Sequence, residues 1–263
     1  MTDVLSELVQ NAERLIKAGY YKDGVLPIGR RRPISLVRAL RDHPNFPIIA
    51  EVKLSSPYRR GLSGHAAAEL IRNYVEGGAA ALSVLTEPTF FEGSLDNLRI
   101  ASVTGLPVLM KDIVLREKQI DAGAKRGASA VLLIEKAFTY GVAKFSLDTM
   151  IEKAHSRGLE VLLEVSDDEE MRRALQRKAD MIGINQRDLT TMAMDVQKGV
   201  RMLQEFRPMA DVPIIVMSGI ETRSQVEELR DHGAAGVLIG TSLSSKPDPM
   251  DALLALEVPR WSK

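Results

Sequence analysis

The segment IIAEVKLSSP, residues 48–57, adds charged side chains to the end of an apolar run. Alternate residues of a strand point to the same side of a sheet, so Glu51 and Lys53 share one face. A surface strand alternates apolar and polar residues along its length, whereas a buried parallel strand is apolar on both faces. Because only the carboxyl end of this segment is charged, it predicts a buried strand that leaves the core and enters a polar site.

Seven other apolar runs, rich in Val, Ile and Leu, follow at fairly even spacing. With the first, which extends over 46–53, they cover residues 80–86, 106–113, 128–136, 159–165, 180–185, 212–219 and 234–240. A segment with helical periodicity follows each run, and several of these segments end at a glycine. Eight strands, each followed by a helix, predict an α/β fold of the (β/α)8 TIM barrel type. A doubly wound open sheet is the competing arrangement, but its Gly-rich first turn, GxGxxG, is missing here.

Residues 1–46 precede the repeat. They contain one amphipathic segment, MTDVLSELVQNAERLIK at 1–17, and a second short helical stretch at 33–41. We therefore predict an N-terminal helical extension over residues 1–46 that packs on a catalytic barrel over residues 47–263.

The overall composition narrows the choice of partners. Among the 263 residues, Lys plus Arg and Asp plus Glu both number 35, so the formal net charge is zero and no nucleic-acid partner is expected. The chain has no cysteine and its four histidines follow no metal-ligand spacing, so no metal is expected. No apolar run approaches the roughly 18 residues of a membrane span, and the N-terminal segment carries both signs of charge, unlike a signal peptide. We expect a cytoplasmic protein, and its protein partners stay open.

Charged or polar residues end several of the predicted strands. Glu51 and Lys53 end the first strand, Lys111 the third, Glu164 the fifth and Asn185 the sixth. In a (β/α)8 barrel the active site lies at the carboxyl ends of the strands, so these side chains are expected to meet there. Lysines and carboxylates crowded together perturb one another's pKa values, and such a site can hold a general acid and a general base. The alternative is a set of buried ion pairs without chemistry.

Small-residue turns follow the last two strands. Ser218-Gly219 and Gly240-Thr241 each lie between a strand and a helix, where backbone N–H groups bind anions. The loops after strands 7 and 8 are the usual phosphate position in this fold, although ordinary turns have the same composition. Phe90 and Phe91, in the loop after strand 2, are candidates for the wall of an aromatic substrate site or residues that only pack their loop.

These residues lie in motifs that resemble the indole-3-glycerol phosphate synthase family over nearly the whole chain. The motifs are IIAEVKLSSP, LTEPTFFEGS, LPVLMKDIVL with the following QID, VLLIEK, LLEVSDDEE, IGINQRDL, MSGI and VLIGTSL. The resemblance implies a carboxy-lyase of tryptophan biosynthesis that closes the ring of 1-(2-carboxyphenylamino)-1-deoxyribulose 5-phosphate to an indole and releases carbon dioxide and water. It also implies a phosphorylated small-molecule substrate and no cofactor.

The resemblance implies roles for the residues at the strand ends. Lys111 resembles the general acid that protonates the ribulose oxygen, and Glu164 the acid or base of the later dehydration. Lys53 resembles the group that holds the substrate carboxylate and also delivers a proton. The other matches are Glu51 and Asn185, which orient the lysines and sugar hydroxyls, Ser56 and Arg187, which contact the carboxylate and hydroxyls, and Ser218, Gly219, Gly240 and Thr241, which cradle the phosphate.

Three positions depart from the family pattern. Met217 stands where the family usually has a glutamate before Ser-Gly, Ile113 stands where it often has phenylalanine, and Tyr58 stands where it prefers serine. We expect Ile113, like Phe90, to contact the aromatic part of the substrate. The three departures surround the aryl and carboxylate pocket rather than the phosphate turns, so an altered substrate in a divergent or redesigned barrel is an open alternative.

Two other functions are compatible with the residues alone. A lysine desolvated near another cation can be nucleophilic, so a Schiff-base aldolase, or else a sugar-phosphate isomerase, fits the same strand ends. A phosphometabolite-binding protein without activity fits the loss of the carboxylate at Met217.

Overall fold

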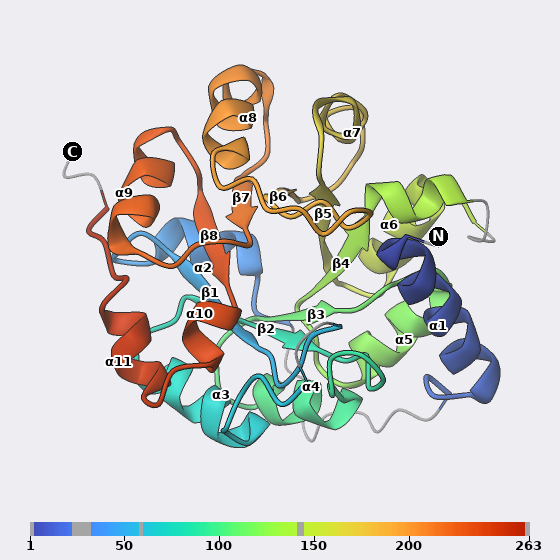
Figure 1. Ribbon diagram of the computed structural model, residues 1–263. Helices are drawn as coiled ribbons and strands as arrows, with labels where there is room; N and C mark the ends of the chain where they lie inside the picture. Colours follow the sequence, from blue (N-terminus) through green and yellow to red (C-terminus); the bar gives the residue numbers. More distant parts are fainter. Residues whose placement is uncertain (1–2, 23–32, 58–59, 141–144, 261–263) are drawn as a thin grey trace.

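The computed structural model describes residues 3–22, 33–57, 60–140 and 145–260. Within these ranges eight parallel strands form a closed barrel in sequence order, as Figure 1 shows. The closure is direct, because β1 pairs with β2 on one side and with β8 on the other. The predicted (β/α)8 barrel is confirmed and the open doubly wound sheet is wrong, since an open sheet leaves two strands with an unpaired edge.

The strands are β1 (Ile48–Val52), β2 (Ala81–Leu85), β3 (Val108–Lys111), β4 (Ala130–Ile134), β5 (Glu160–Val165), β6 (Met181–Asn185), β7 (Ile214–Met217) and β8 (Gly236–Ile239). The α-helices are α1 (Val4–Ala18), α2 (Leu36–Asp42), α3 (Ala67–Glu76), α4 (Leu95–Ser102), α5 (Glu117–Lys125), α6 (Leu147–Ser156), α7 (Asp168–Ala174), α8 (Lys198–Phe206), α9 (Arg223–Asp231), α10 (Thr241–Ser244) and α11 (Pro249–Leu254). Two 3-10 helices, η1 (Glu135–Tyr140) and η2 (Arg207–Met209), complete the described elements.

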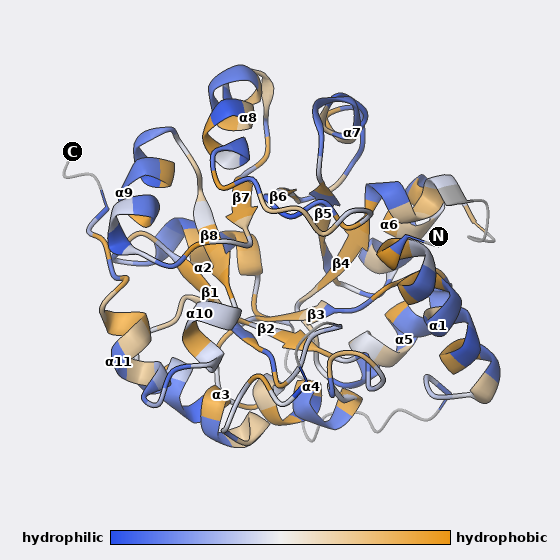
Figure 2. Ribbon diagram, in the orientation of Figure 1, coloured by the Kyte–Doolittle hydropathy of each residue, from blue (hydrophilic) through white to orange (hydrophobic). Residues whose placement is uncertain are grey.

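The apolar strands form the centre of the molecule. Nearly every strand residue is buried, because one face of each strand fills the barrel interior and the other packs under the helices. Figure 2 shows this as an apolar ring of strands surrounded by helices with polar outer surfaces. The amphipathic pattern of the helices therefore follows from the need to cover a sheet that is apolar on both sides.

Local signals define where the helices begin and end. The side chains of Ser94, Ser146 and Thr222 each accept a hydrogen bond from the backbone N–H three residues later, which caps α4, α6 and α9. After α6 the chain turns at Gly158, whose φ of 74° is in the left-handed region that favours glycine. These short-range features place the strands at regular intervals around the barrel.

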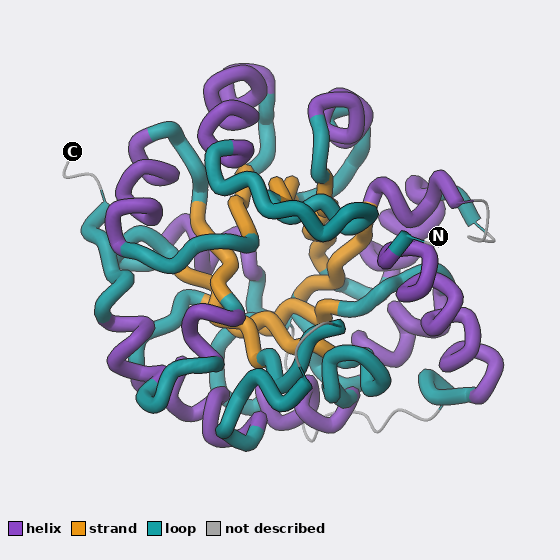
Figure 3. Tube along the Cα trace, in the orientation of Figure 1, coloured by secondary structure: helices purple, strands orange, loops and turns teal. Residues whose placement is uncertain are grey.

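The strand register brings the polar strand ends together. Glu51 pairs with Ser83 on β2, and Glu164 pairs with Gly183 on β6, one residue pair before each of these ladders ends. Since all eight strands are parallel, their carboxyl ends lie at the same end of the barrel. Figure 3 shows loops gathered around this end.

The helices α1 and α2 contact opposite ends of the barrel. The side chains of Asn11 on α1 and of Tyr21, just beyond its end, reach Glu87, after β2, and Asp112, after β3, so α1 and the turn after it lie against the carboxyl ends of the strands. The N-terminus of α2 instead donates to Glu160, the first residue of β5, at the amino end. The division into an extension over 1–46 and a barrel over 47–263 stays a prediction.

None of the helices in the described ranges is both long and apolar enough to cross a bilayer.

Candidate active site

A cavity of about 600 Å³ opens at the carboxyl ends of the strands. Ten of the side chains or turns predicted from the sequence line it: Glu51, Lys53, Ser56, Lys111, Asn185, Arg187, Ser218, Gly219, Gly240 and Thr241. They come from the ends of β1, β3 and β6 and from the turns after β7 and β8. Residues far apart in the sequence therefore meet because the barrel closes.

The carboxylate of Glu51 lies between two lysines. Its Oε1 is 3.8 Å from Nζ of Lys53, and its Oε2 is 3.5 Å from Nζ of Lys111. Glu51 is only 4% exposed, so it interacts with both ammonium groups in a setting where water screens charge poorly. This answers why β1 carries both a carboxylate and a lysine on one face: the carboxylate holds a pair of lysines that would otherwise repel each other.

The two lysines differ in their proton affinity. Burial, and then the neighbouring cations Lys111 and Arg187, lower the pKa of Lys53, although Glu51 opposes this. Burial also acts against the charge on Lys111, but attraction to Glu51 and Glu164 outweighs it and raises the pKa of Lys111. Lys111 is therefore held as an ammonium ion, and Lys53 is the lysine that releases a proton more readily.

Glu164 is buried, with 2% of its surface exposed, and it does not line the cavity. Burial raises the pKa of this carboxyl group, against the opposing effects of Lys111 and of a hydrogen bond from Asn185. The donor is Nδ2 of Asn185, 2.7 Å from Oε1 of Glu164, and Oδ1 of Asn185 accepts from the backbone N–H of Arg187 at 2.9 Å. The other oxygen of Glu164, Oε2, is buried without a hydrogen-bond partner among the described residues. An unpartnered carboxyl oxygen with a raised pKa is suited to proton transfer.

The turn after β7 has a constrained backbone. Ser218 and Gly219 have φ values of 72° and 70°, and Gln186 Nε2 donates to the Ser218 carbonyl at 2.7 Å. In the turn after β8, Oγ of Ser242 donates to the carbonyl of Ile220 at 2.6 Å, which joins the two turns. Paired small-residue turns at this edge of the barrel are the arrangement that binds phosphate in this fold.

The apolar wall of the cavity differs in detail from the sequence-based expectation. Phe91 lines the cavity, with Nζ of Lys53 5.9 Å from its ring centre, whereas neither Phe90 nor Ile113 is among the described lining residues. The carboxylate of Glu87 accepts from the backbone N–H groups of both phenylalanines and so fixes the loop that carries them. The substrate contacts predicted for Phe90 and Ile113 stay predictions.

Sequence reasoning missed several other apolar lining residues. These are Leu8 from α1, Leu62, and Leu189, Met192, Met194 and Val196 from the loop after β6. Leu8 belongs to the amphipathic segment predicted to pack on the barrel, whereas the spacing of the others carries no strand or helix period that predicts a cavity wall. Met217, the departure from the family pattern, also lines the cavity, and Tyr58 lies outside the described residues.

In the parts of the chain that the structure covers, no group of three or more His, Cys, Asp and Glu side chains is arranged to bind a metal ion.

This combination of fold and site defines a class: (β/α)8-barrel enzymes in which lysine and carboxylate acid–base groups share one cavity with small-residue turns after β7 and β8. Comparison with known proteins narrows the class. The family described as indole-3-glycerol phosphate synthase matches residues 25–256. The chain belongs to this family, whose members are decarboxylating lyases of tryptophan biosynthesis that act on a phosphorylated small molecule.

Individual relatives agree with the family match. The chain is 41% identical over 222 residues to indole-3-glycerol phosphate synthase of Halobacterium salinarum, a match that covers 83% of each chain. It is 35% identical over 264 residues to the enzyme of the same name from Syntrophobacter fumaroxidans, with 97% of each chain covered.

A solved structure confirms the fold alone. The N-acetylmannosamine-6-phosphate 2-epimerase of Clostridium perfringens superimposes with a TM-score of 0.60 at 15% identity, over 78% of this chain and 90% of that one.

Proposed function

We propose that this cavity binds 1-(2-carboxyphenylamino)-1-deoxyribulose 5-phosphate and converts it to indole-3-glycerol phosphate, carbon dioxide and water. Family membership supports the reaction, and one observation supports the site: two lysines joined by Glu51 share a cavity with both small-residue turns. The small-residue turns after β7 and β8 suit an anion that anchors the substrate. The two lysines and Glu51 supply acid–base groups beside the apolar wall.

The substrate has two anionic groups that the cavity can hold apart. We assign the phosphate to the turns at Ser218-Gly219 and Gly240-Thr241 and the aryl carboxylate to Lys53, with Arg187 and Ser56 as further contacts. Binding at both ends brings the aryl carbon close to the ribulose carbonyl. The entropy that ring closure requires is then lost on binding, which lowers the activation barrier of the closure step.

Ring closure needs a proton donor at the ribulose carbonyl oxygen. The aryl carbon that bears the carboxylate attacks the carbonyl carbon, and the oxygen becomes a hydroxyl as it takes a proton. Lys111 suits this step because Glu51 keeps its amine protonated at neutral pH. Loss of carbon dioxide then restores the aromatic ring without a further acid.

Dehydration completes the indole. The new hydroxyl leaves as water after it is protonated, and a proton leaves the adjacent carbon that carries the ring nitrogen. We assign these proton transfers to Lys53, whose pKa is lowered by burial, and to Glu164, whose pKa is raised by burial. Opposite shifts bring an amine and a carboxyl group toward the same pH range, as paired acid–base catalysis requires.

We also propose that the reaction takes place in the cytoplasm, for which a chain without cysteine is suited. That the chain binds no nucleic acid also stays a prediction, based on its net charge of zero.

Turnover of the substrate tests this function. Incubation of the purified protein with the aryl ribulose phosphate should produce indole fluorescence together with one carbon dioxide for each product molecule. A folded protein that gives no product contradicts the proposal. With a keto sugar phosphate and borohydride, we expect no covalent lysine adduct, whereas an adduct would favour a Schiff-base aldolase.

A further inference from the structure

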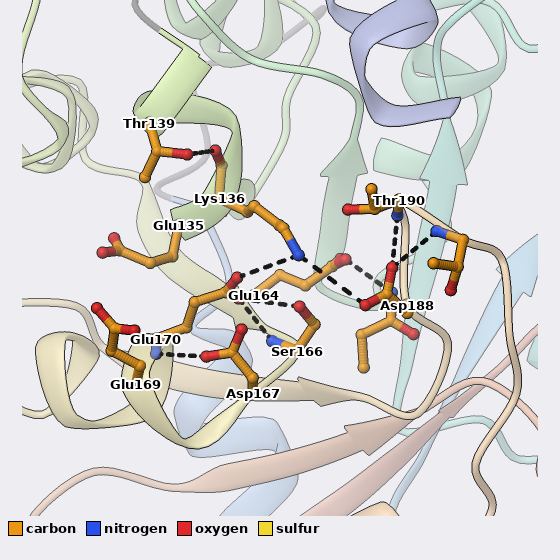
Figure 4. Close-up of polar contacts among 12 residues, drawn as sticks. Glu135, Lys136, Thr139, Glu164, Ser166, Asp167, Glu169, Glu170, Asp188 and Thr190 are labelled. Atoms are coloured by element: carbon orange, nitrogen blue, oxygen red, sulfur yellow. Dashed lines mark hydrogen bonds and ion pairs between the residues drawn. The ribbon is translucent and has the colours of Figure 1, made fainter. Parts of the chain in front are cut away.

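Lys136, which does not line the cavity, lies between two carboxylates, as Figure 4 shows. Its Nζ is 4.0 Å from Oε1 of Glu170 and 3.9 Å from Oδ2 of Asp188. The lysine belongs to η1, directly after β4, while Glu170 belongs to α7, after β5, and Asp188 to the loop after β6. One ammonium group therefore joins the segments that follow three consecutive strands.

Glu170 connects this lysine to the end of β5. Its Oε2 accepts hydrogen bonds from the backbone N–H of Ser166 at 2.7 Å and from the Ser166 hydroxyl at 3.1 Å. Ser166 is two residues beyond Glu164, the carboxyl group assigned to proton transfer. Glu170 therefore fixes the turn that follows β5, directly after Glu164 and Val165. Figure 4 shows Glu164 within the same group of residues.

Asp188 connects the lysine to the loop after β6. Its Oδ1 accepts from the N–H groups of Thr190 and Thr191 at 2.7 and 2.9 Å, and its backbone carbonyl accepts from the N–H of Met192 at 2.7 Å. Its neighbour Arg187 lines the cavity, as does Met192. Asp188 thus sets the conformation of a loop that supplies both a cationic and an apolar contact to the site.

We propose that Lys136 is a positioning residue, which holds Glu164 and Arg187 in their working geometry by clamping Glu170 and Asp188 together. This inference rests on the proposed function and adds to it a residue outside the cavity lining. Asn185 joins β5 and β6 directly, through its hydrogen bond to Glu164, and the Lys136 clamp joins the same two strands a second time, through the segments that follow them.

Charge explains why the clamp needs a cation. Glu170 is 3% exposed, and burial, with help from Asp167, raises its pKa to about 7, while the N–H of Ser166 and the ammonium of Lys136 oppose the rise. Arg173, on the same helix, is a second cation that is attracted electrostatically to Glu170. Without Lys136, the two carboxylates lose the positive charge that they share, and the segments after β5 and β6 lose their electrostatic link.

Steady-state kinetics of Lys136→Met and Lys136→Arg test the inference. Because misplacement of catalytic groups lowers the rate of the chemical steps, we expect Lys136→Met to lower kcat by about tenfold and to change KM by less than about threefold. Lys136→Arg keeps the charge and should recover most of kcat. Lys153→Met is the matched control, since Lys153 also bridges two carboxylates, Glu117 at 3.4 Å and Asp121 at 3.3 Å, but between α5 and α6 on the outside of the barrel.

Asp188→Asn provides a second variant if Lys136→Met does not fold. Asparagine can still accept from Thr190 and Thr191, so only the charge that faces Lys136 is lost, and the same fall in kcat is expected. In the double variant the two losses should not multiply, because both remove one interaction. Wild-type kcat in both single variants, a loss of kcat that Lys136→Arg does not recover, or an equal loss in Lys153→Met overturns the inference alone. A wild-type protein without turnover overturns the proposed function and the inference together.

Discussion

The absence of a side chain at position 240 makes room for the central carboxylate of the site. A Cβ placed on Gly240 would lie 2.5 Å from Oε1 of Glu51, closer than any normal contact. Because Oε1 is the atom that faces Lys53, a side chain at 240 would disturb the pairing of the lysines as well as the turn after β8.

Gly240→Ala should therefore impair catalysis more than stability. Displacement of Glu51 removes the group that holds both lysines, so we expect kcat to fall by at least about tenfold while thermal unfolding shifts little. Steady-state assays and thermal unfolding measure the two effects. Gly64→Ala is the control, since a Cβ there meets nothing within 4 Å. Wild-type kcat in Gly240→Ala would show that Glu51 can move without consequence.

Lys111→Met tests the acid assigned to ring closure. Loss of a positioned general acid lowers rates by about 10²- to 10⁴-fold, and we expect kcat to fall within this range while the variant stays folded. Single-turnover assays with circular dichroism spectra measure both quantities. The exposed lysine at the end of α5 offers a control, Lys125→Met, which should keep full activity. Retained kcat in Lys111→Met would remove this lysine from the mechanism.

At the scale of the element, α2 is held at both ends by residues from distant parts of the chain. Its first N–H groups, those of Leu36 and Val37, donate to Glu160 at 2.7 and 3.1 Å. At its other end the guanidinium of Arg260 donates to the carbonyls of Leu40 and Arg41. An anion at the N-terminus and a cation at the C-terminus both stabilise the helix dipole, which makes this short helix a stable cover for the amino end of the barrel.

Glu160→Ala should destabilise the protein without affecting the reaction. Removal of a charged cap from a helix N-terminus costs about 1–2 kcal/mol, and this cap lies at the barrel end opposite the cavity. Urea unfolding should show a lower free energy of unfolding, while kcat stays at the wild-type value. Glu152→Ala, an exposed position on α6, is the control. An unchanged unfolding free energy would mean that water replaces the cap.

At the scale of the whole molecule, buried carboxyl groups make stability depend on pH. Asp112, the residue after Lys111, is buried, and burial raises its pKa to about 6, against hydrogen bonds from Thr86, Tyr21 and the N–H of Ile113. A carboxyl group with a raised pKa binds its proton more tightly in the folded state than in the unfolded state. The free energy of unfolding therefore falls as pH rises from the ordinary aspartate pKa of 3.8 through about 6.

Asp112→Asn should remove this pH dependence. The amide can accept from the N–H of Ile113 and donate to the hydroxyls of Thr86 and Tyr21, so the contacts are kept without a charge. Relative to this variant, we expect the wild-type protein to lose roughly 2 kcal/mol of unfolding free energy between pH 4 and pH 7, since one pKa unit corresponds to about 1.4 kcal/mol and part of the effect falls below pH 4. Denaturant titrations at several pH values measure the difference, and parallel pH profiles for the two proteins would contradict it.

Much of the fold and many of the site residues were predictable because their signals are local. Burial of both faces makes each barrel strand apolar, and the fold places chemistry at the carboxyl ends, so charged residues such as Lys111 stand out in the sequence. The choice between Phe90 and Phe91 was not predictable in this way. The loop that carries both residues is fixed by hydrogen bonds to Glu87, and another donor to Glu87 is Asn11, 76 residues earlier in the chain.

The sequence by itself determined the (β/α)8 barrel, the strand ends that carry Glu51, Lys53, Lys111, Glu164 and Asn185, and the small-residue turns after β7 and β8, because periodicity and turn composition act over a few residues. Only the tertiary structure decided that α1 and α2 contact opposite ends of the barrel, that Glu164 is buried outside the cavity lining, and that Lys136 pairs with both Glu170 and Asp188. Those arrangements arise from hydrogen bonds and ion pairs between residues far apart in the chain, which exist only once the barrel has closed.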